Sequence, residues 1–387
     1  MKKQSKNEKF HNLHFELGDF STTISFHSSA DTLLAFGNIN WVLICDESMV
    51  NRVRTFMPDT QNLEDVPLLK CPADLESLSR ADTIDTPAKT GLRGIIALPA
   101  GEGAKSMEWI EFMLNAAFAL KLSRDSMFAA LGGGALSDAA AFAASIFLRG
   151  ITLIIIPSTL LAMVDAAFGG KTGINYIGFK NMVGTIYPAN ELRICPALIE
   201  SLPQREYLSG LAEVIKAAML NDAVLLEFLE ERHADIINRD KDCLFEIIRR
   251  SLGVKGAVVT KDLREGGLRA HLNLGHTFAH ALEAVDTFST WKHGEAVAWG
   301  IFRALILGEF LKETDGAYRN RITRLLQLYG YRLNVDSIAD DALLAAMKRD
   351  KKHMRGEVRF VLQHGQGETF QRTASDSSVL AALQYKV

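Results

Sequence analysis

Short apolar runs alternate with helical patterns through the first half of the chain. Residues 41–48, WVLICDES, and 93–103, RGIIALPAGEG, each carry a β-branched apolar run that ends in a turn. Residues 126–147 run from a similar strand through glycines into an alanine-rich helix, and residues 150–161 form another apolar strand. This alternation is typical of a parallel sheet covered by helices. Residues 74–92 have no long apolar period and are expected to form a surface excursion.

From about Leu202 the pattern changes to helical periods with few strand signals. Five amphipathic or apolar helical segments are predicted, at residues 205–220, 223–238, 243–259, 296–311 and 318–330. The sequence therefore predicts an N-terminal α/β domain over residues 1–201 and an all-α domain over residues 202–387. Small-molecule sites are common between domains, so we expect a ligand in the cleft between these two.

Composition mainly excludes classes of protein. The chain has 387 residues, 48% of them hydrophobic, and a formal net charge of −3, which gives no electrostatic reason to expect nucleic acid or an anionic membrane as partner. Its four cysteines are far apart and form no CxxC, as in reduced intracellular proteins. The basic N-terminal stretch lacks the apolar run of a signal peptide, and no apolar run is long enough to cross a membrane. We expect a cytoplasmic enzyme or binding protein.

A glycine-rich loop, LGGGALSD at residues 131–138, lies between a predicted strand and a predicted helix. Glycines at this position let backbone N–H groups approach a phosphate at the helix N-terminus. The loop is not G-x-G-x-x-G and lacks the P-loop lysine, so a dinucleotide site and a tight structural turn both stay open. Asp138 could cap the helix, or accept hydrogen bonds from a ribose or a nicotinamide amide.

A second polar string follows the strand at residues 150–161. It consists of Asp165, Lys171, Asn175, Lys180 and Asn181, with glycines among them in the sequence. Lysines beside flexible backbone suit a small ligand with several negative charges. A solvated glycine-rich loop is the alternative, but the apolar strand before the string and Asp165 at its start favour a cleft wall.

Four of the ten histidines gather in one short stretch of the second half. His276 and His280 are four residues apart on a predicted helix, a spacing that can present paired metal ligands, although such a pair is more often structural. His293 opens the next helix, and Glu213 would complete the N,N,O set of a catalytic zinc site. Glu213 and Lys216 are three apart, so by themselves they indicate a surface ion pair.

A series of strings spans nearly the whole chain, in the order PAGEGAKS, GGGALSD, FLRG, PSTLLAMVDAAFGGKTGIN, KNMVG, LPQREYLSGLAEVIK, REGGLRAHLNLGHTFAHALE, KHGEAVAWG and DKKHMRGEVRFVL. In these strings and in their order the sequence resembles the 3-dehydroquinate synthase family of the sugar phosphate cyclases. The resemblance implies a Rossmann-like NAD-binding domain over residues 1–201 and a helical metal- and substrate-binding domain over residues 202–387. It also implies NAD, one divalent metal (Zn²⁺ or Co²⁺), a small-molecule sugar phosphate substrate and a cytoplasmic homodimer.

The resemblance carries roles to individual residues. The metal ligands fall on Glu213, His276 and His293. The NAD contacts fall on Asp46, Glu102, Lys105, Gly134, Asp138, Ser158, Thr159, Lys171 and Lys180. Substrate contacts fall on Arg149 (from a neighbouring subunit), Asn181, Lys255, Arg269, Asn273, and Lys352 in preference to Lys351. Catalytic roles fall on Lys171, Lys216, His280 and Asp165, whereas His271 matches no functional position.

The implied reaction converts 3-deoxy-D-arabino-heptulosonate 7-phosphate to 3-dehydroquinate and phosphate. A hydride passes to NAD⁺, phosphate leaves by β-elimination, the hydride returns, and an intramolecular aldol reaction closes the ring. Two departures from the family pattern, Ser137 and Phe179 where glycine is usual, concern the geometry of the cofactor loop. The alternatives are a sibling cyclase that closes another sugar phosphate, a metal-dependent polyol dehydrogenase, and a non-catalytic sugar-phosphate-binding module. Arg269 and Asn273 favour the implied formation of 3-dehydroquinate over the reaction of a sibling cyclase.

Overall fold

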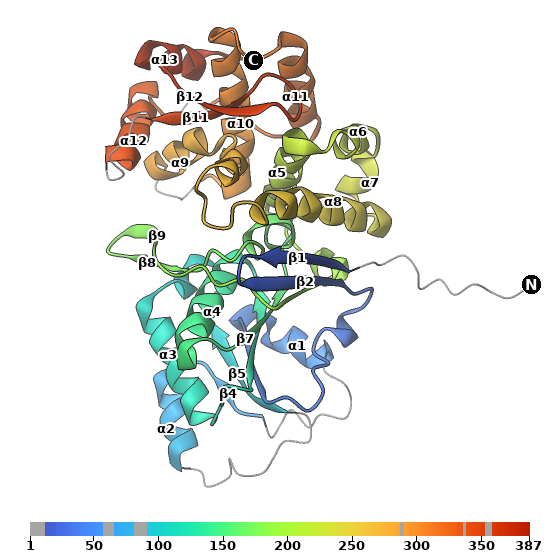
Figure 1. Ribbon diagram of the computed structural model, residues 1–387, viewed down its shortest axis with the longest axis vertical. Helices are drawn as coiled ribbons and strands as arrows, with labels where there is room; N and C mark the ends of the chain where they lie inside the picture. The colour runs from blue at the N-terminus through green and yellow to red at the C-terminus, as the bar shows by residue number, and fades with distance from the viewer. Residues whose placement is uncertain (1–11, 57–65, 81–90, 287–289, 336–337, 353–357) are drawn as a thin grey trace, which may run out of the picture. The chain divides into compact units, whose positions relative to one another are not determined.

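The computed structural model describes residues 12–56, 66–80, 91–286, 290–335, 338–352 and 358–387 (Figure 1). The chain divides into two compact units, Met1–Ser201 and Leu202–Val387. No helix in the described part of the chain combines the length and apolar character needed to cross a membrane.

An eight-stranded sheet forms the N-terminal unit, in the order β1-β2-β10-β7-β6-β3-β5-β4. Its strands are β1 (Leu13–Leu17), β2 (Phe20–Phe26), β3 (Trp41–Asp46), β4 (Leu68–Leu69), β5 (Leu92–Leu98), β6 (Met127–Gly132), β7 (Thr152–Pro157) and β10 (Glu191–Ile194). All neighbours pair in parallel except the antiparallel β1 and β2. Strands β3 and β6 are buried at every position, because parallel sheets are covered on both faces. The predicted parallel sheet is confirmed.

Helices cover both faces of this sheet. They are α1 (Val50–Phe56), α2 (Pro72–Arg80), α3 (Met107–Ala119) and α4 (Gly134–Ile146). In Figure 1, α2, α3 and α4 lie on one side of the strands and α1 on the other, as right-handed crossovers require for this strand order. The expected excursion at 74–92 is wrong in part, because residues 74–80 belong to the surface helix α2 and the chain re-enters the sheet at Leu92, while residues 81–90 lie outside the described residues.

Nine helices and a hairpin are described in the C-terminal unit. The helices are α5 (Gln204–Asn221), α6 (Ala223–Glu231), α7 (His233–Ile237), α8 (Lys241–Val259), α9 (His276–Val285), α10 (His293–Phe310), α11 (Gly316–Leu328), α12 (Asp340–Lys352) and α13 (Asp376–Gln384). The hairpin consists of β11 (Arg359–Gln363) and β12 (Thr369–Thr373), which the sequence pattern did not indicate. Helix α10 is buried almost all round and packs against α5, α9, α11 and α13, as an apolar core helix does.

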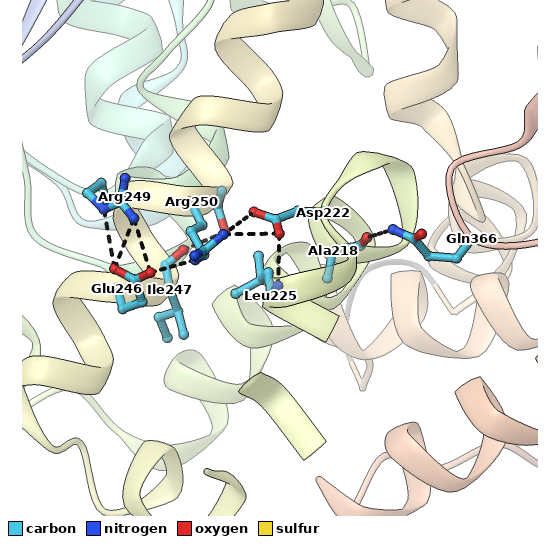
Figure 2. Close-up of polar contacts among 9 residues, drawn as sticks. Ala218, Asp222, Leu225, Glu246, Ile247, Arg249, Arg250 and Gln366 are labelled. Carbon is cyan, nitrogen blue, oxygen red and sulfur yellow. Dashed lines mark hydrogen bonds and ion pairs between the residues drawn. The ribbon is translucent and has the colours of Figure 1, made fainter. Parts of the chain in front are cut away.

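A network of charged side chains joins α8 to the junction of α5 and α6 (Figure 2). Arg250 on α8 donates to both carboxylate oxygens of Asp222, at 3.2 and 3.1 Å, and to Glu246 at 2.5 Å. Asp222 in turn caps α6, because its side chain accepts a hydrogen bond from the backbone N–H of Leu225 at 2.8 Å. The network holds α8 beside α5, the helix that carries Glu213.

Candidate functional site

Three helices of the C-terminal unit bring a carboxylate and two imidazoles together. Glu213 lies in the buried middle of α5, while His276 and His293 are the first residues of α9 and α10. Each residue offers one ligand atom, and these atoms all lie within 4.8 Å of one another. Of the His276 and His280 pair that the sequence could leave as structural, only His276 belongs to this group, and its partner imidazole there is His293.

Glycines make this close approach of the helices possible. A Cβ on Gly294 would lie 2.0 Å from the backbone oxygen of Ser209, one turn before Glu213 on α5, so α10 meets α5 without room for a side chain. Gly275, at a φ of +80°, ends the turn before α9, and a Cβ there would lie 2.6 Å from the backbone nitrogen of Ile301. Only glycine suits both the left-handed conformation and this contact. The histidines directly beside these two glycines are the candidate ligands.

The distances in the group fit one metal ion. Nε2 of His276 lies 3.7 Å from Oε1 of Glu213, and Nε2 of His293 lies 3.4 Å from the same oxygen. Two atoms that bind one zinc ion tetrahedrally at about 2.1 Å are about 3.4 Å apart. The donor set of two nitrogens and one oxygen leaves a fourth position open, as in catalytic zinc sites.

The other nitrogen of each imidazole has an acceptor of its own. Nδ1 of His276 lies 3.2 Å from the backbone oxygen of Leu274, and Nδ1 of His293 lies 3.4 Å from Oε1 of Glu283. Such contacts place the proton on Nδ1 and leave Nε2 free to bind a metal. The arrangement supports the assignment of both histidines as ligands.

The pKa values of the two histidines move in opposite directions. Burial, and then the positive charge of Lys216, lower the pKa of His276 to about 3, so this ring is neutral, as a ligand must be. Burial alone would lower the pKa of His293 too, but hydrogen bonds to Glu213 and Glu283 raise it to about 10. A metal at this site therefore has to displace a proton from His293.

Lys216 forms the i,i+3 ion pair with Glu213 that the sequence indicated, but the pair is not at the surface. Its Nζ contacts Oε2 of Glu213, and the two side chains are 5% and 1% exposed. The surface interpretation is wrong because both residues lie on the face of α5 that packs into the unit. Oε1 of Glu213, the oxygen that faces both histidines, is not the one that Lys216 contacts.

Other predicted residues of this unit lie on neighbouring elements. His280 is exposed on α9, and its ring centroid lies 5.4 Å from that of His276. Arg269 is buried and donates to the backbone oxygen of Leu263, while Asn273 donates to Glu265 at 2.7 Å. Lys255 is buried on α8. Lys352 is the last residue of α12, and its side chain, like that of Lys351, lies outside the described residues.

In the N-terminal unit, the glycine loop leads from β6 directly into α4. Gly133 is the N-cap of α4 and Gly134 its first residue. The backbone N–H of Gly133 donates to Asp46 at the end of β3, at 3.4 Å, and burial raises the pKa of that carboxyl group. Ser137 does not distort the loop, because it is buried within α4 and its hydroxyl donates to the Gly133 carbonyl at 3.0 Å. The helix N-terminus can still bind an anion.

A polar network connects two predicted sets of ligand-binding residues. Nζ of Lys105, which is almost completely buried, lies 2.5 Å from Asp138 on α4 and 2.5 Å from Asn181. Asn181 belongs to β9 (Phe179–Val183), which pairs with β8 (Ile174–Tyr176). Asn175 on β8 donates to Glu102 at 2.7 Å and accepts from the backbone of Asn181 at 3.1 Å. Asp138 therefore pairs with a lysine and does not cap its helix, and Asn181 lies with residues predicted to contact the cofactor.

The remaining predicted residues of this unit surround the same loops. Ser158 and Thr159 follow β7, and the Ser158 N–H donates to the Gly132 carbonyl at 2.8 Å. Lys171 and Lys180 are exposed, whereas Asp165 is half-buried in the short helix Ala162–Ala166. Arg149 is exposed with a φ of +69°. Phe179 is 52% exposed, opposite Tyr176 beside the hairpin turn, and the glycine of that turn is Gly178, with a φ of +78°.

Comparison with known proteins decides the family. The family models described as 3-dehydroquinate synthase N-terminal and C-terminal match residues 95–209 and 210–353. The 3-dehydroquinate synthase of Solibacter usitatus is 40% identical over 286 residues, which cover 73% of this chain and 80% of that protein. The chain belongs to the 3-dehydroquinate synthase family. A second member, the 3-dehydroquinate synthase of Thermodesulfovibrio yellowstonii, is 40% identical over 275 residues, 71% of this chain and 77% of its own.

Solved structures of related cyclases share the fold. The 2-epi-5-epi-valiolone synthase of Streptomyces hygroscopicus subsp. jinggangensis, solved with NAD⁺ and Zn²⁺ bound, has a TM-score of 0.77 at 24% identity, over 93% of this chain and 95% of its own. A 2-deoxy-scyllo-inosose synthase, solved with carbaglucose-6-phosphate, NAD⁺ and Co²⁺, has a TM-score of 0.77 at 20% identity, over 97% of this chain and 99% of its own. The expected fold class, a Rossmann-like parallel sheet followed by a helical part, is confirmed.

Two polar residues of these networks were not singled out from the sequence. They are Glu283 beside His293 and Glu265 beside Asn273, and the contact of Asn175 with Glu102 was not expected either. Glu283 could have been found, because it lies seven residues after His276 and therefore on the same face of α9, two turns along. No local pattern indicates the partners of Asn175 and Glu265, since each pair is set by the fold.

Proposed function

We propose that this protein is a 3-dehydroquinate synthase, which converts 3-deoxy-D-arabino-heptulosonate 7-phosphate to 3-dehydroquinate and inorganic phosphate. The observation that carries the proposal is the group formed by Glu213, His276 and His293, in a chain that matches the family over both of its parts. The family supplies the reaction, and the geometry supplies a donor set that suits it.

Glu213, His276 and His293 hold one divalent metal, Zn²⁺ or Co²⁺, through one carboxylate oxygen and two Nε2 atoms. A bound metal lowers the pKa of hydroxyl groups that it contacts, and bound NAD takes up and returns a hydride. Glu213 keeps Oε1 directed at the histidines while Lys216 contacts Oε2, so the lysine orients the carboxylate. To His280, which is exposed on the same helix as His276, we assign the movement of protons to and from the substrate hydroxyls.

NAD binds at the N-terminus of α4. The backbone N–H groups after Gly133 face the phosphates, whose charge the helix dipole favours. The other cofactor contacts are Asp46, Glu102, Lys105, Asp138, Ser158, Thr159, Lys171 and Lys180. Within the network of Lys105, the buried ammonium holds Asp138 and Asn181 in place, which keeps the hairpin β8–β9 beside the cofactor loop.

The cations bind the two anionic ends of the substrate. Lys171, together with Asn181, Lys352 and Arg149 of a neighbouring subunit, binds the phosphate. Lys255 and Arg269 bind the carboxylate, and the guanidinium of Arg269 is oriented by its bond to the Leu263 carbonyl. Asp165, Lys216 and Asn273 contact the hydroxyl groups. We propose a homodimer because Arg149 is expected to reach the site from a second copy. We also propose that the protein is cytoplasmic.

The test is product analysis across several substrates. The purified protein is incubated with NAD⁺, Zn²⁺ or Co²⁺, and in turn the seven-carbon keto acid phosphate, sedoheptulose 7-phosphate and glucose 6-phosphate. We expect phosphate release and a carbocyclic product of the mass of 3-dehydroquinate from the keto acid phosphate. A carbocycle formed only from one of the other two sugars would assign the chain to a sibling activity, and no carbocycle from any of them would contradict the proposal.

A further inference from the structure

We propose that Glu283 is a positioning residue for the metal site, which it serves by fixing the orientation and proton position of His293. The inference rests on the metal site proposed above and adds a residue that contacts neither substrate nor metal. Its basis is the contact of 3.4 Å between Oε1 of Glu283 and Nδ1 of His293.

His293 lies between two carboxylates. Its Nε2 is 3.4 Å from Oε1 of Glu213, and its Nδ1 is 3.4 Å from Oε1 of Glu283. An imidazole that binds a metal through Nε2 carries its proton on Nδ1 and needs an acceptor there. Glu283 is the acceptor on that side, so the contact selects the tautomer that presents Nε2 to the metal.

The carboxylate of Glu283 is suited to this role by its burial. Its side chain is only 8% exposed, so water does not compete strongly for the contact with His293. His293 itself is the first residue of α10, and its side chain is 32% exposed. The buried carboxylate on α9 therefore contacts a ring that is itself partly open to solvent.

The two histidine ligands differ in their supports. His276 donates Nδ1–H to a neutral acceptor, the backbone oxygen of Leu274, which no side-chain substitution removes. His293 uses a charged acceptor, which makes its imidazole the more basic ligand of the two. Because Glu283 and His276 share α9, the helix that supplies one ligand also supplies the support of the other.

A purely structural role of Glu283, a link between α9 and α10, is the alternative. With such a role, substitution of Glu283 would change the stability of the unit but not the rate at which the folded protein releases its metal. The rate at which bound metal leaves the folded protein separates the two roles. This rate also starts from the metal-bound state, so it does not depend on the proton that His293 carries without metal.

The experiment loads the full-length protein with Co²⁺ and follows the loss of the visible Co²⁺ absorption after addition of excess EDTA. Wild type is compared with Glu283→Gln, Glu283→Ala and the control Glu246→Gln. Glu246 is also a helical glutamate of the same unit with charged partners, Arg249 and Arg250, but it has no part in the proposed site. Thermal unfolding of each variant without metal reports the structural contribution separately.

We expect release about 10- to 100-fold faster in Glu283→Ala, because loss of an outer partner typically weakens metal binding by that factor. Glu283→Gln, which keeps the volume and an acceptor oxygen but loses the charge, should fall between Glu283→Ala and wild type, and Glu246→Gln should match wild type. The inference would be overturned if Glu283→Gln released Co²⁺ at the wild-type rate while Glu283→Ala did so too or failed to fold. It would also be overturned if the control Glu246→Gln released Co²⁺ as fast as the Glu283 variants. A wild-type protein that retains no Co²⁺ would instead contradict the proposed metal site itself.

Discussion

Two neighbouring glycines at the start of α4 should respond to alanine in different ways. At Gly133 a new Cβ would have Thr159 Cγ2 at 3.5 Å as its nearest neighbour, an ordinary contact, and the backbone angles of φ −77° and ψ −177° are open to any residue. At Gly134 a new Cβ would lie 2.8 Å from the Cβ of Ala166. Carbon atoms need about 3.5–4.0 Å, and neither Cβ can rotate away.

The magnitudes follow from these contacts. Gly134→Ala gains about 0.4–1 kcal/mol from the stiffer unfolded chain but loses about 1–3 kcal/mol to overpacking, so at the middle of both ranges the free energy of unfolding should fall by about 1.3 kcal/mol. For a unit of this size that lowers Tm by roughly 3–5 °C. Gly133→Ala has only the gain, so its Tm should equal or slightly exceed that of wild type. With NAD bound as proposed, however, its methyl group beside Thr159 would stand between the backbone and the pyrophosphate.

Thermal unfolding followed by circular dichroism without NAD⁺, and NAD⁺ titration calorimetry, separate the two effects. We expect Gly133→Ala to weaken NAD⁺ binding at least about 10-fold, or about 1.4 kcal/mol, with Tm unchanged. Wild-type affinity in a folded Gly133→Ala protein would refute the placement of the cofactor at this loop. A Tm for Gly134→Ala at or above that of wild type would refute the packing argument.

Three further results are expected. Glu213→Ala should lose bound metal and activity together, since a three-ligand site binds far more weakly with two ligands, and full metal content by plasma emission would exclude Glu213 as a ligand. Lys171→Ala should mainly lower kcat, because Lys171 is proposed to bind the phosphate that leaves in the reaction, and Arg269→Ala should mainly raise KM, because the carboxylate takes no part in the bond changes. The reverse pattern in steady-state kinetics would mean that the substrate binds the other way round. Lys105→Met should lower the free energy of unfolding by about 1–3 kcal/mol in urea titrations, and adding Asp138→Leu should recover part of the loss, whereas additive losses would show that the pair is not coupled.

The sheet could be predicted only where burial makes the sequence apolar. Strands β3, β5, β6 and β7 are central and nearly continuous runs of apolar residues, and all four were predicted. Strands β1, β2 and β10 mix polar and apolar positions because they lie towards one edge, where one side can face water. The parallel pairing of β2 with β10 joins residues far apart in sequence, which no local pattern indicates.

The candidate site shows the same limit. Local spacing left His276 and His280 open between a structural pair and a metal pair, and it interpreted Glu213 and Lys216 as a surface contact. The resemblance to the family singled out His293 as the second imidazole, and the folded chain shows how Gly275 and Gly294 let three helices approach so closely. Neither local spacing nor the resemblance identified the charge partners. Lys105 contacts Asp138 and Asn181, and His293 contacts Glu283, only through tertiary packing.

The balance of NADH against phosphate during turnover tests the proposed reaction most directly. The protein with NAD⁺, metal and the seven-carbon keto acid phosphate is followed at once for inorganic phosphate and for nicotinamide absorbance, with samples lacking NAD⁺ or metal as controls. We predict phosphate release over many turnovers that requires both NAD⁺ and metal, while NADH stays flat, because each hydride returns to the molecule from which it came. NADH that accumulates in proportion to substrate consumed, or phosphate release that is independent of NAD⁺, would contradict the account.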